Sequence, residues 1–518
     1  MLLRLSDQTF KRQFGPFTYF FHRLYASDRV FRDAEVFCEK LTRVPTEKSE
    51  MVNYILSIYT DGDKEEICRD FDEFVTMLVQ EGYLLAGDTP EAQDAQEQRF
   101  TYNVEKPKTI AQYEHRQSAD GGFSKISQDV LGEYFRENPT LFSLHMDITQ
   151  NCTERCRHCY IPAYNPLYLS YEKICEVLDE FRAMGGLSIS LSGGECMMHK
   201  DFTRIVQAIR ERDCTVGVLS NLTVCTDEKI RVLREADATV QVSLYSMVPE
   251  IHDAVTCLKG SWKRTVDAII RLRAADVPVR ISCPCLQINY QGYPDVIKFA
   301  ESLKMSAQTD FIIMAKYDGD CSNLCNRLTI PQTREILEDV ILRAVPTESE
   351  YFAVGKKAEM PSPEAWMAQK ACGAGVDSLC LAANGDFYPC PAFGDYVVGN
   401  VHEQSLKEVW LNSEKLNLVR HATKAKFPKC AVCKDRDYCS ICLCRNYNET
   451  GDMFTPAGHF CKVAEQNHIV VDMKHEQMKK QWKQQEALFW GAPKLLQMMT
   501  AAMKFKDTPW KKSYDQPR

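Results

Sequence analysis

The stretch ITQNCTERCRHCY, residues 148–160, sets three cysteines in a short polar loop directly behind an apolar segment. Cys152, Cys156 and Cys159 follow the spacing CxxxCxxC. At the cysteine frequency of this chain, chance would produce that spacing in roughly 0.04 of sequences of this length, which makes the pattern informative. The loop is therefore a candidate metal-binding site.

Three interpretations of the loop follow from its donor atoms. Zinc in a structural site takes four protein ligands, and His158 is the one further candidate within the loop. A 4Fe-4S cluster held by three thiolates leaves one iron open, and an open iron can bind and activate a small molecule. Buried thiols without a metal are the third interpretation. The donor set favours the iron-sulfur cluster.

The segments around the loop alternate between strand-like and helix-like patterns. Alternation of this kind implies parallel pairing with right-handed crossovers. We therefore expect an α/β fold, with a partial (β/α)6 barrel of the TIM type over residues 141–345 and its chemistry at the carboxyl ends of the strands. The predicted strands are 141–149, 187–191, 214–219, 239–245, 279–286 and 309–314, and the predicted helices are 170–184, 201–212, 227–236, 262–275, 293–304 and 331–344.

Composition excludes several classes of protein. The chain has 518 residues, of which 45% are hydrophobic and 26% charged, as is typical of a globular protein with three or four domains. A net charge of -8 gives no basic field, so we expect no nucleic-acid partner. No signal segment and no membrane-length apolar run is present, so we expect a cytoplasmic protein with no membrane partner. In a reducing compartment, 23 cysteines are metal ligands or buried thiols rather than disulfides.

The cysteine loop, followed by the aromatic Tyr160, resembles the signature of the radical S-adenosylmethionine (SAM) superfamily. The resemblance continues along the barrel with LSGGEC, SNLT and SLYS, which follow the second, third and fourth predicted strands. Taken alone, a glycine pair is more often a turn, and a serine at a strand end is more often a helix cap. Cys196 departs from many relatives, which have proline after the GGE motif. The resemblance implies that SAM contacts Tyr160, Gly193, Gly194, Glu195, Ser220, Asn221 and Ser243.

The resemblance also implies the reaction. Cys152, Cys156 and Cys159 would hold the catalytic 4Fe-4S cluster, which transfers one electron to the sulfonium of SAM. SAM then splits into methionine and a 5'-deoxyadenosyl radical, which abstracts an unactivated hydrogen atom. The cofactor supplies the reactivity, and the barrel orients the substrate and excludes water. The chain is expected to be a radical SAM oxidoreductase.

Nine further cysteines lie between residues 372 and 461. By themselves, Cys430 and Cys433 fit a zinc ribbon and an iron-sulfur site equally well. The whole arrangement resembles the SPASM domain, here residues 346–467, which carries two auxiliary 4Fe-4S clusters. The spacing after Cys439 departs from the usual three residues, which leaves the fourth ligand of the first cluster open, or a free position for substrate. The implied ligands are Cys372, Cys380 and Cys390, with Cys442 or Cys444, for the first cluster, and Cys430, Cys433, Cys439 and Cys461 for the second.

The two ends of the chain complete the predicted organisation. Residues 1–90 read as helices with a small sheet and close on EGYLL. They resemble the RiPP recognition element, a winged-helix-like domain that binds the leader of ribosomally made, post-translationally modified peptides; a structural cap or dimerisation domain is the alternative. Residues 91–140 are a predicted linker. Residues 468–518 are a helical extension, docked or flexible, and 406–420 is a predicted helix.

These resemblances predict a radical SAM peptide maturase with three 4Fe-4S clusters and SAM. It would install thioether links, from cysteine sulfur to carbon, in a ribosomally synthesised precursor peptide with a leader, as in sactipeptides and ranthipeptides. A flavodoxin or ferredoxin would donate the electrons. The alternatives are a peptide epimerase or carbon-carbon crosslinking enzyme, a sulfatase-type maturase that generates formylglycine, and a zinc-rich binding scaffold with no enzymatic activity.

Overall fold

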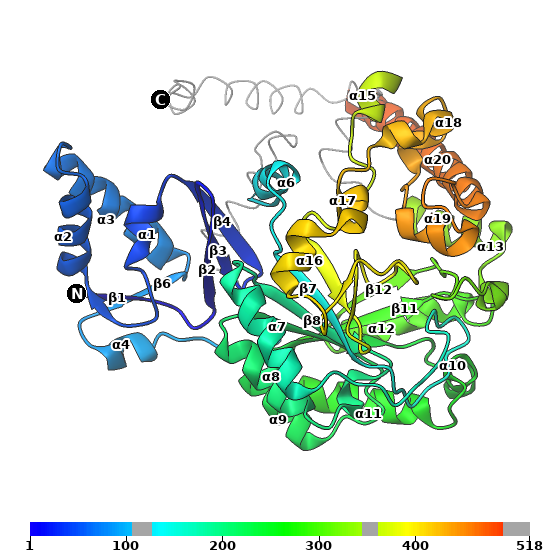
Figure 1. Cartoon of the computed structure of the whole chain (residues 1–518). Helices are drawn as coiled ribbons and strands as arrows, with labels where there is room; N and C mark the ends of the chain where they lie inside the picture. Colours follow the sequence, from blue (N-terminus) through cyan, green and yellow to red (C-terminus); the bar gives the residue numbers. More distant parts are fainter. Residues whose placement is uncertain (106–126, 344–360, 490–518) are drawn as a thin grey trace.

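The barrel forms the centre of the computed structural model, which describes residues 1–105, 127–343 and 361–489 (Figure 1). Six consecutive strands pair in parallel and in sequence order, and the connecting helices pack on one face of the sheet. The predicted α/β fold with a partial barrel is confirmed. The strands are β7 (Ser143–Thr149), β8 (Ser188–Gly193), β9 (Thr215–Ser220), β10 (Thr239–Ser243), β11 (Val279–Pro284) and β12 (Ser306–Asp310).

The barrel differs from the prediction in one helix and one strand. An additional helix, α10 (Pro249–Thr256), precedes α11, and the sixth strand lies at 306–310 rather than 309–314. The strand was predicted at 309–314 because residues 311–314 are apolar, but the edge strand that pairs with β11 is polar and partly exposed. The helices are α7 (Tyr171–Ala183), α8 (Phe202–Glu211), α9 (Asp227–Glu235), α10, α11 (Ser261–Ala274), α12 (Tyr293–Ser302) and α13 (Ile330–Arg343).

The C-terminal unit continues the barrel sheet. Strand β13 (Ser378–Leu381) pairs in parallel with β7, and β14 (Asp386–Tyr388) and β15 (Gly399–Asn400) extend the sheet antiparallel. The pairing of Cys380 with His145 therefore joins residues that are far apart in the sequence. The sheet order is β12-β11-β10-β9-β8-β7-β13-β14-β15.

Helices complete this unit, and one of them crosses a predicted domain boundary. The predicted helix 406–420 is broken at Ser413, whose side chain accepts a hydrogen bond from the Leu416 N–H and begins a new helix. Helix α20 runs without interruption across the predicted boundary at residue 467, and the extension beyond residue 489 lies outside the described residues. The helices are α15 (Pro363–Met367), α16 (Leu406–Asn412), α17 (Glu414–Arg420), α18 (Pro428–Ala431), α19 (Leu443–Thr450) and α20 (Gly458–Phe489).

The N-terminal unit contains two small antiparallel sheets and several helices. One sheet has the order β5-β1-β6 and the other β2-β3-β4. Phe71, Val75 and Leu78 recur along one face of α3 and are buried against the strands. The elements are β1 (Leu2–Leu5), β2 (Thr9–Phe14), β3 (Phe17–His22), β4 (Ser27–Arg32), α1 (Glu35–Glu39), β5 (Thr46–Glu47), α2 (Lys48–Ile58), α3 (Lys64–Gln80) and β6 (Leu84–Gly87).

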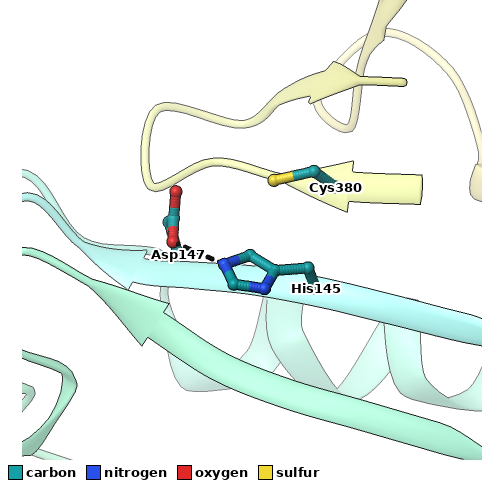
Figure 2. Close-up of side chains that lie close together, drawn as sticks. All are labelled: His145, Asp147 and Cys380. Atoms are coloured by element: carbon teal, nitrogen blue, oxygen red, sulfur yellow. Dashed lines mark hydrogen bonds and ion pairs between the residues drawn. The ribbon is translucent and has the colours of Figure 1, made fainter. Parts of the chain in front are cut away.

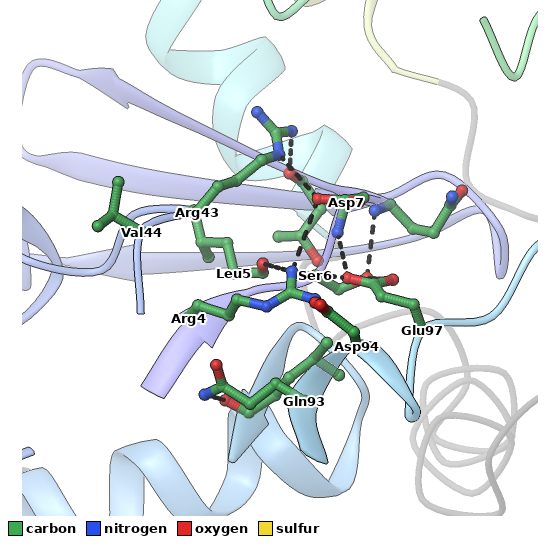
Figure 3. A network of polar contacts seen from close by, with 12 residues as sticks. Arg4, Leu5, Ser6, Asp7, Arg43, Val44, Gln93, Asp94 and Glu97 are labelled. Atoms are coloured by element: carbon green, nitrogen blue, oxygen red, sulfur yellow. Dashed lines mark hydrogen bonds and ion pairs between the residues drawn. The ribbon is translucent and has the colours of Figure 1, made fainter. Parts of the chain in front are cut away.

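A polar network ties β1 to the chain that follows this unit (Figure 3). The buried Arg4 guanidinium donates to Asp94 Oδ1 and to Glu97 Oε1, each at 2.9 Å. The Ser6 hydroxyl and the Asp7 N–H also donate to the Glu97 carboxylate. Helix α4 (Pro90–Asp94) and the residues after it are therefore part of the N-terminal unit, although the sequence assigns them to a linker. Residues 106–126 of that predicted linker lie outside the described residues.

The N-terminal unit packs against the amino-terminal ends of the barrel strands. Arg12 pairs with Asp213 (2.8 Å) just before β9, and Gln8 donates to Asp237 (3.1 Å) just before β10. Phe14 packs against Phe135 of α6 (Ser127–Glu137), and both belong to one aromatic cluster at this junction. Cofactor-binding loops of such barrels lie at the carboxyl ends of the strands, so the N-terminal unit is at the opposite end. Among the described residues, no helix has the length and apolarity needed to span a membrane.

Candidate radical SAM and iron-sulfur sites

The three cysteines of the loop converge behind the carboxyl end of β7. The Cys152 Sγ accepts hydrogen bonds from the Glu154 N–H (3.4 Å) and the Asn221 amide (3.7 Å). The Cys156 thiol donates to Glu154 Oε2 at 3.2 Å. Burial, together with the neighbouring carboxylates and the Cys159 thiol, raises the pKa of the Cys152 thiol to about 12. A cation between the thiols would remove this barrier to ionisation, so the donor set fits a cluster.

Neighbouring loops hold the backbone of the cysteine loop in place. Asn323 is buried, and its amide donates to the carbonyls of His158 (3.2 Å) and Cys159 (3.3 Å). Asn326 donates to the carbonyl of Arg157 at 3.0 Å. These two asparagines lie on a short 3-10 turn more than 160 residues along the chain, and the sequence analysis did not find them. Asparagine spacing alone carries no signal for such a contact.

His158, the one candidate for a fourth zinc ligand in the loop, is buried beside Tyr245. The two rings meet edge to face with centroids 5.3 Å apart. Burial lowers the pKa of His158 to about 4, so its imidazole is neutral. The hydroxyl of Tyr245 in turn donates to the Cys156 Sγ at 3.9 Å.

The two glycines of the GGE motif let the end of β8 pass against the residues that precede Cys152. The Gly194 N–H donates to the Thr149 carbonyl and the Glu195 N–H donates to the Asn151 carbonyl, both at 2.8 Å. Gly193 has a φ of +129°, and a Cβ there would lie 2.1 Å from the Thr149 carbonyl oxygen. A Cβ at Gly194 would lie 2.4 Å from the Asn151 carbonyl oxygen. Both positions therefore require glycine.

The carboxylate of Glu195 joins the end of β8 to the end of β9. It is buried and accepts hydrogen bonds from the Ser220 hydroxyl (2.7 Å), the Asn221 N–H (2.7 Å) and the Met197 N–H (3.0 Å). Burial raises the pKa of Glu195, and the hydrogen bonds oppose that shift. Since Asn221 also contacts Cys152, four of the residues predicted from the sequence lie together.

The remaining residues of the resemblance lie at the edges of this group. Ser243 ends β10 and contacts Tyr245, which links it to Cys156. Tyr160 packs against Tyr317, with ring centroids 4.8 Å apart, and its carbonyl accepts from the Tyr317 N–H. The Cys196 thiol is fully buried and donates to the Leu219 carbonyl at 3.2 Å, so it fills a position inside the sheet.

The first group of C-terminal cysteines contains both Cys442 and Cys444, between which the sequence left the fourth ligand open. The sulfur atoms of Cys442 and Cys444 lie 3.1 Å apart. Cys444 also shares a hydrogen bond with Cys390, and Cys372 interacts with Cys390 and Cys442. Four thiols therefore gather at this point. Cys380 is buried on β13, where it interacts with Cys390 and with Asp147.

The second group joins the start of α20 to the loop around α18. Cys430 interacts with Cys433 and Cys461, and Cys439 interacts with the same residues. Cys461 lies in the first turn of α20, more than twenty residues beyond Cys439. Like-charged neighbours and burial raise the pKa of Cys430 and Cys439, so this donor set also fits a metal cluster.

Comparisons with known proteins match the two parts of the chain that carry these cysteines. A family description, "Radical SAM superfamily", matches residues 146–300, and a second, the SPASM "Iron-sulfur cluster-binding domain", matches residues 372–435. An AdoMet-dependent heme synthase of Methanosarcina barkeri is 25% identical over 329 residues, covering 59% of this chain and 92% of that protein. PqqA peptide cyclase of Gluconobacter oxydans is 26% identical over 333 residues, covering 60% of this chain and 87% of that protein.

A solved structure shares the fold over most of the chain. Streptococcus suis SuiB bound to its precursor peptide SuiA aligns with a TM-score of 0.58 at 15% identity, covering 87% of this chain and 97% of SuiB. The two regions that match the family descriptions include the cysteine loop, the GGE motif and most of the C-terminal cysteines. Residues 146–300 of the chain are therefore a radical SAM domain, and residues 372–435 are an SPASM domain.

Proposed function

We propose that this protein is a radical SAM peptide maturase that installs thioether links, from a cysteine sulfur to a carbon atom, in a ribosomally synthesised precursor peptide. The observation that carries the proposal is the pairing of β13 with β7. This pairing joins the C-terminal cysteine groups to the strand whose end carries the SAM loop. Similarity to a peptide cyclase and to a protein bound to a precursor peptide supports a peptide substrate.

Three 4Fe-4S clusters and SAM are the cofactors that we propose. Cys152, Cys156 and Cys159 would hold the cluster that binds SAM. When bound, these groups supply the electron that splits SAM to a 5'-deoxyadenosyl radical, and an acceptor for the electron that thioether formation releases. For the first auxiliary cluster, the resemblance implied Cys372, Cys380 and Cys390 with Cys442 or Cys444. We propose instead the four thiols that gather together, which are Cys372, Cys390, Cys442 and Cys444. The proposed ligands of the second cluster are Cys430, Cys433, Cys439 and Cys461.

The protein groups around this site orient the bound molecules. The Glu195 carboxylate, fixed by Ser220 and Asn221, would accept hydrogen bonds from the SAM amino group. Because Glu195 is buried, that contact would be shielded from water and strengthened. Gly193 and Gly194 would also meet the SAM amino group, where the absence of side chains leaves room for close approach. Ser220 and Asn221 would lie near the sugar, and Tyr160 and Ser243 would be further contacts of SAM. These roles are transferred from the family resemblance.

Thioether formation balances with one SAM molecule per link. The substrate carbon loses a hydrogen atom to the deoxyadenosyl radical, and the cysteine thiol loses a proton as sulfur and carbon join. The product has lost two hydrogens, and one electron remains to be removed. The electron that begins the cycle comes from outside, and we propose a flavodoxin or ferredoxin as its donor.

The N-terminal unit is the proposed binding site for the leader of the precursor. A three-stranded sheet beside three helices is suited to capture an extended peptide by strand addition at an edge. Tethering a leader raises the effective concentration of the modified segment, so weak contacts suffice at the barrel. A structural cap is the alternative role for this unit, and a leader-binding measurement on the full chain distinguishes the two.

Co-expression with a small cysteine-containing open reading frame beside the gene tests the function. The peptide should lose two hydrogens per link and one alkylatable thiol per link, as measured by mass spectrometry with and without iodoacetamide. Loss of two hydrogens with all thiols still reactive would favour a carbon-carbon crosslink. An unchanged mass with altered stereochemistry would favour an epimerase, and an aldehyde would favour formylglycine formation. Iron near twelve per chain supports the clusters, whereas zinc without sulfide would leave a scaffold.

A second candidate function follows from the similarity to an AdoMet-dependent heme synthase. That similarity covers 59% of this chain. The docked N-terminal unit, with its two sheets, favours the peptide substrate because strand addition requires such edges. Conversion of an added tetrapyrrole by the reduced enzyme, together with an unchanged precursor peptide, would favour the second function.

A further inference from the structure

Three metal-binding side chains meet on the inner face of the barrel sheet, outside the SAM loop. His145 and Asp147 lie two residues apart on β7, and Cys380 lies on β13 opposite His145 in the parallel register. Figure 2 shows the three side chains gathered between these two strands. One donor atom of each residue, an imidazole nitrogen, a carboxylate oxygen and a thiol sulfur, lies within 4.8 Å of the other two.

The direction of these side chains follows from the alternation of β7. Leu144, Met146 and Ile148 are fully buried in the core that the helices form on one face of the sheet. Successive side chains of a strand point to opposite faces, so His145 and Asp147 point to the inner face of the barrel. Their side chains are 15% and 12% exposed, so both keep some contact with solvent.

Cys380 is not needed to complete the first auxiliary site. Cys372, Cys390, Cys442 and Cys444 already bring four thiols together, and a 4Fe-4S cluster takes four. The Cys380 thiol lies near Cys390 and also interacts with the carboxylate of Asp147. The Asp147 Oδ1 also accepts a hydrogen bond from His145 Nε2 at 3.1 Å.

The spacing of the donor atoms suits a single metal ion. Three atoms that are at most 4.8 Å apart all lie within about 2.8 Å of a common point. Zinc binds sulfur at ~2.3 Å and nitrogen or oxygen at ~2.0–2.2 Å, so each donor would move by less than about 1 Å. A mixed thiolate, imidazole and carboxylate set is suited to a borderline cation such as Zn²⁺.

We propose that His145, Asp147 and Cys380 bind one divalent metal ion, with zinc as the best match, on the inner wall of the barrel. Three protein donors leave a fourth position, as in catalytic zinc sites. Water or a donor atom of the substrate, such as a thiolate, would occupy that position. The site is independent of the proposed peptide reaction, because it needs only these three side chains.

Metal analysis of the holoenzyme tests the site. Full-length protein is purified without oxygen, its clusters are reconstituted, and it is dialysed against zinc buffered by a weak chelator. Zinc, iron and sulfide are then measured in the same sample. We expect about one zinc per chain in the wild type, and at least a tenfold weaker zinc affinity in His145→Ala and Asp147→Asn, with iron and sulfide unchanged.

Two matched variants control for nonspecific effects. Ser190 lies opposite His145 in the register between β7 and β8, so Ser190→Ala alters the same region without removing a donor. Cys257 is exposed and distant in sequence from the site, so Cys257→Ser removes a thiol that the proposal does not use. Both variants should keep the zinc. Because Asp147→Asn preserves size, it keeps the test valid if His145→Ala fails to fold.

X-ray absorption at the zinc edge gives a second measurement. The wild type should show one sulfur among nitrogen and oxygen neighbours, and Cys380→Ser should lose that sulfur. Absence of zinc from the wild type, or retention of zinc by all three site variants, would overturn the proposal. Loss of iron and sulfide from Cys380→Ser with zinc unchanged would instead assign Cys380 to the auxiliary cluster. Failure of peptide modification alone would leave these metal measurements unaffected, so the two proposals fail separately.

Discussion

Replacing Gly193 by alanine tests whether the glycine pair shapes the SAM site. The residue has a φ of +129°, a conformation that is essentially restricted to glycine. The new Cβ would lie 2.1 Å from the Thr149 carbonyl oxygen, whereas ordinary contacts begin at 3.4 Å. The backbone at residues 149–151, which leads into Cys152, must therefore move by about 1 Å.

The magnitude of the effect follows from these two sources of strain. The disfavoured backbone conformation costs ~1–3 kcal/mol. Misplacement of a catalytic loop by about 1 Å lowers turnover by ~100-fold. We expect Gly193→Ala to lower the midpoint of unfolding and to lower the rate of 5'-deoxyadenosine formation by about two orders of magnitude. Chemical denaturation and liquid chromatography of the reduced, oxygen-free reaction measure the two quantities.

Gly217→Ala is the matched control for this experiment. Gly217 lies in the neighbouring strand β9, and a Cβ there would meet its nearest atoms at 3.5–3.8 Å, which is ordinary contact. The control should therefore keep near-normal stability and activity. If Gly193→Ala and Gly217→Ala behave alike in both assays, the close approach of β8 to the cysteine loop does not position the site.

Three further predictions concern the clusters, the N-terminal unit and the substrate. Replacing Cys152, Cys156 and Cys159 together by alanine should abolish SAM cleavage. The double variant Cys430→Ala with Cys433→Ala should still form 5'-deoxyadenosine but should yield at least tenfold less modified peptide. If the double variant loses 5'-deoxyadenosine and modified peptide equally, the second cysteine group takes part in SAM cleavage itself. Burial lowers the pKa of His22 to about 3, below its ordinary value near 6.5, so the stability it contributes is full above pH 6.5 and falls as the pH drops toward 3. Between pH 8 and pH 5.5 this amounts to ~1.4 kcal/mol, and urea unfolding at the two pH values should show a smaller loss in His22→Gln; equal losses would exclude His22 as the cause. A leader bound at the amino-terminal ends of the strands must be joined to the modified residue by enough chain to pass along β7, whose seven residues span ~23 Å. Precursors with spacers shorter than about seven residues should therefore bind but show no change of mass in mass spectrometry.

The barrel and the SAM site could be predicted because their signals are local. A helix follows each of the first five barrel strands before the next strand begins, so the alternation along the chain predicts the parallel sheet directly. The cysteine loop and the GGE motif lie at strand ends, where a parallel barrel brings them together. The edge strand at 306–310 was displaced in the prediction because the following run, 311–314, is more apolar than the strand itself.

The contacts between distant segments could not be predicted from the sequence. Asn323 holds the cysteine loop from more than 160 residues away, and its residue type carries no signal for that role. The position of Cys380 depends on the pairing of β13 with β7, which no local pattern encodes. The SPASM resemblance assigned Cys380 to the first auxiliary cluster, and the register places it beside His145 and Asp147 as well as near Cys390.

The most direct test of the account is the fate of SAM on the reduced, reconstituted enzyme in the absence of oxygen. The account predicts equal amounts of 5'-deoxyadenosine and methionine, both measured by mass spectrometry. Both products should disappear in the variant that lacks Cys152, Cys156 and Cys159. A protein that retains its iron and sulfide yet forms no 5'-deoxyadenosine, or a triple variant that still forms it, would contradict the account.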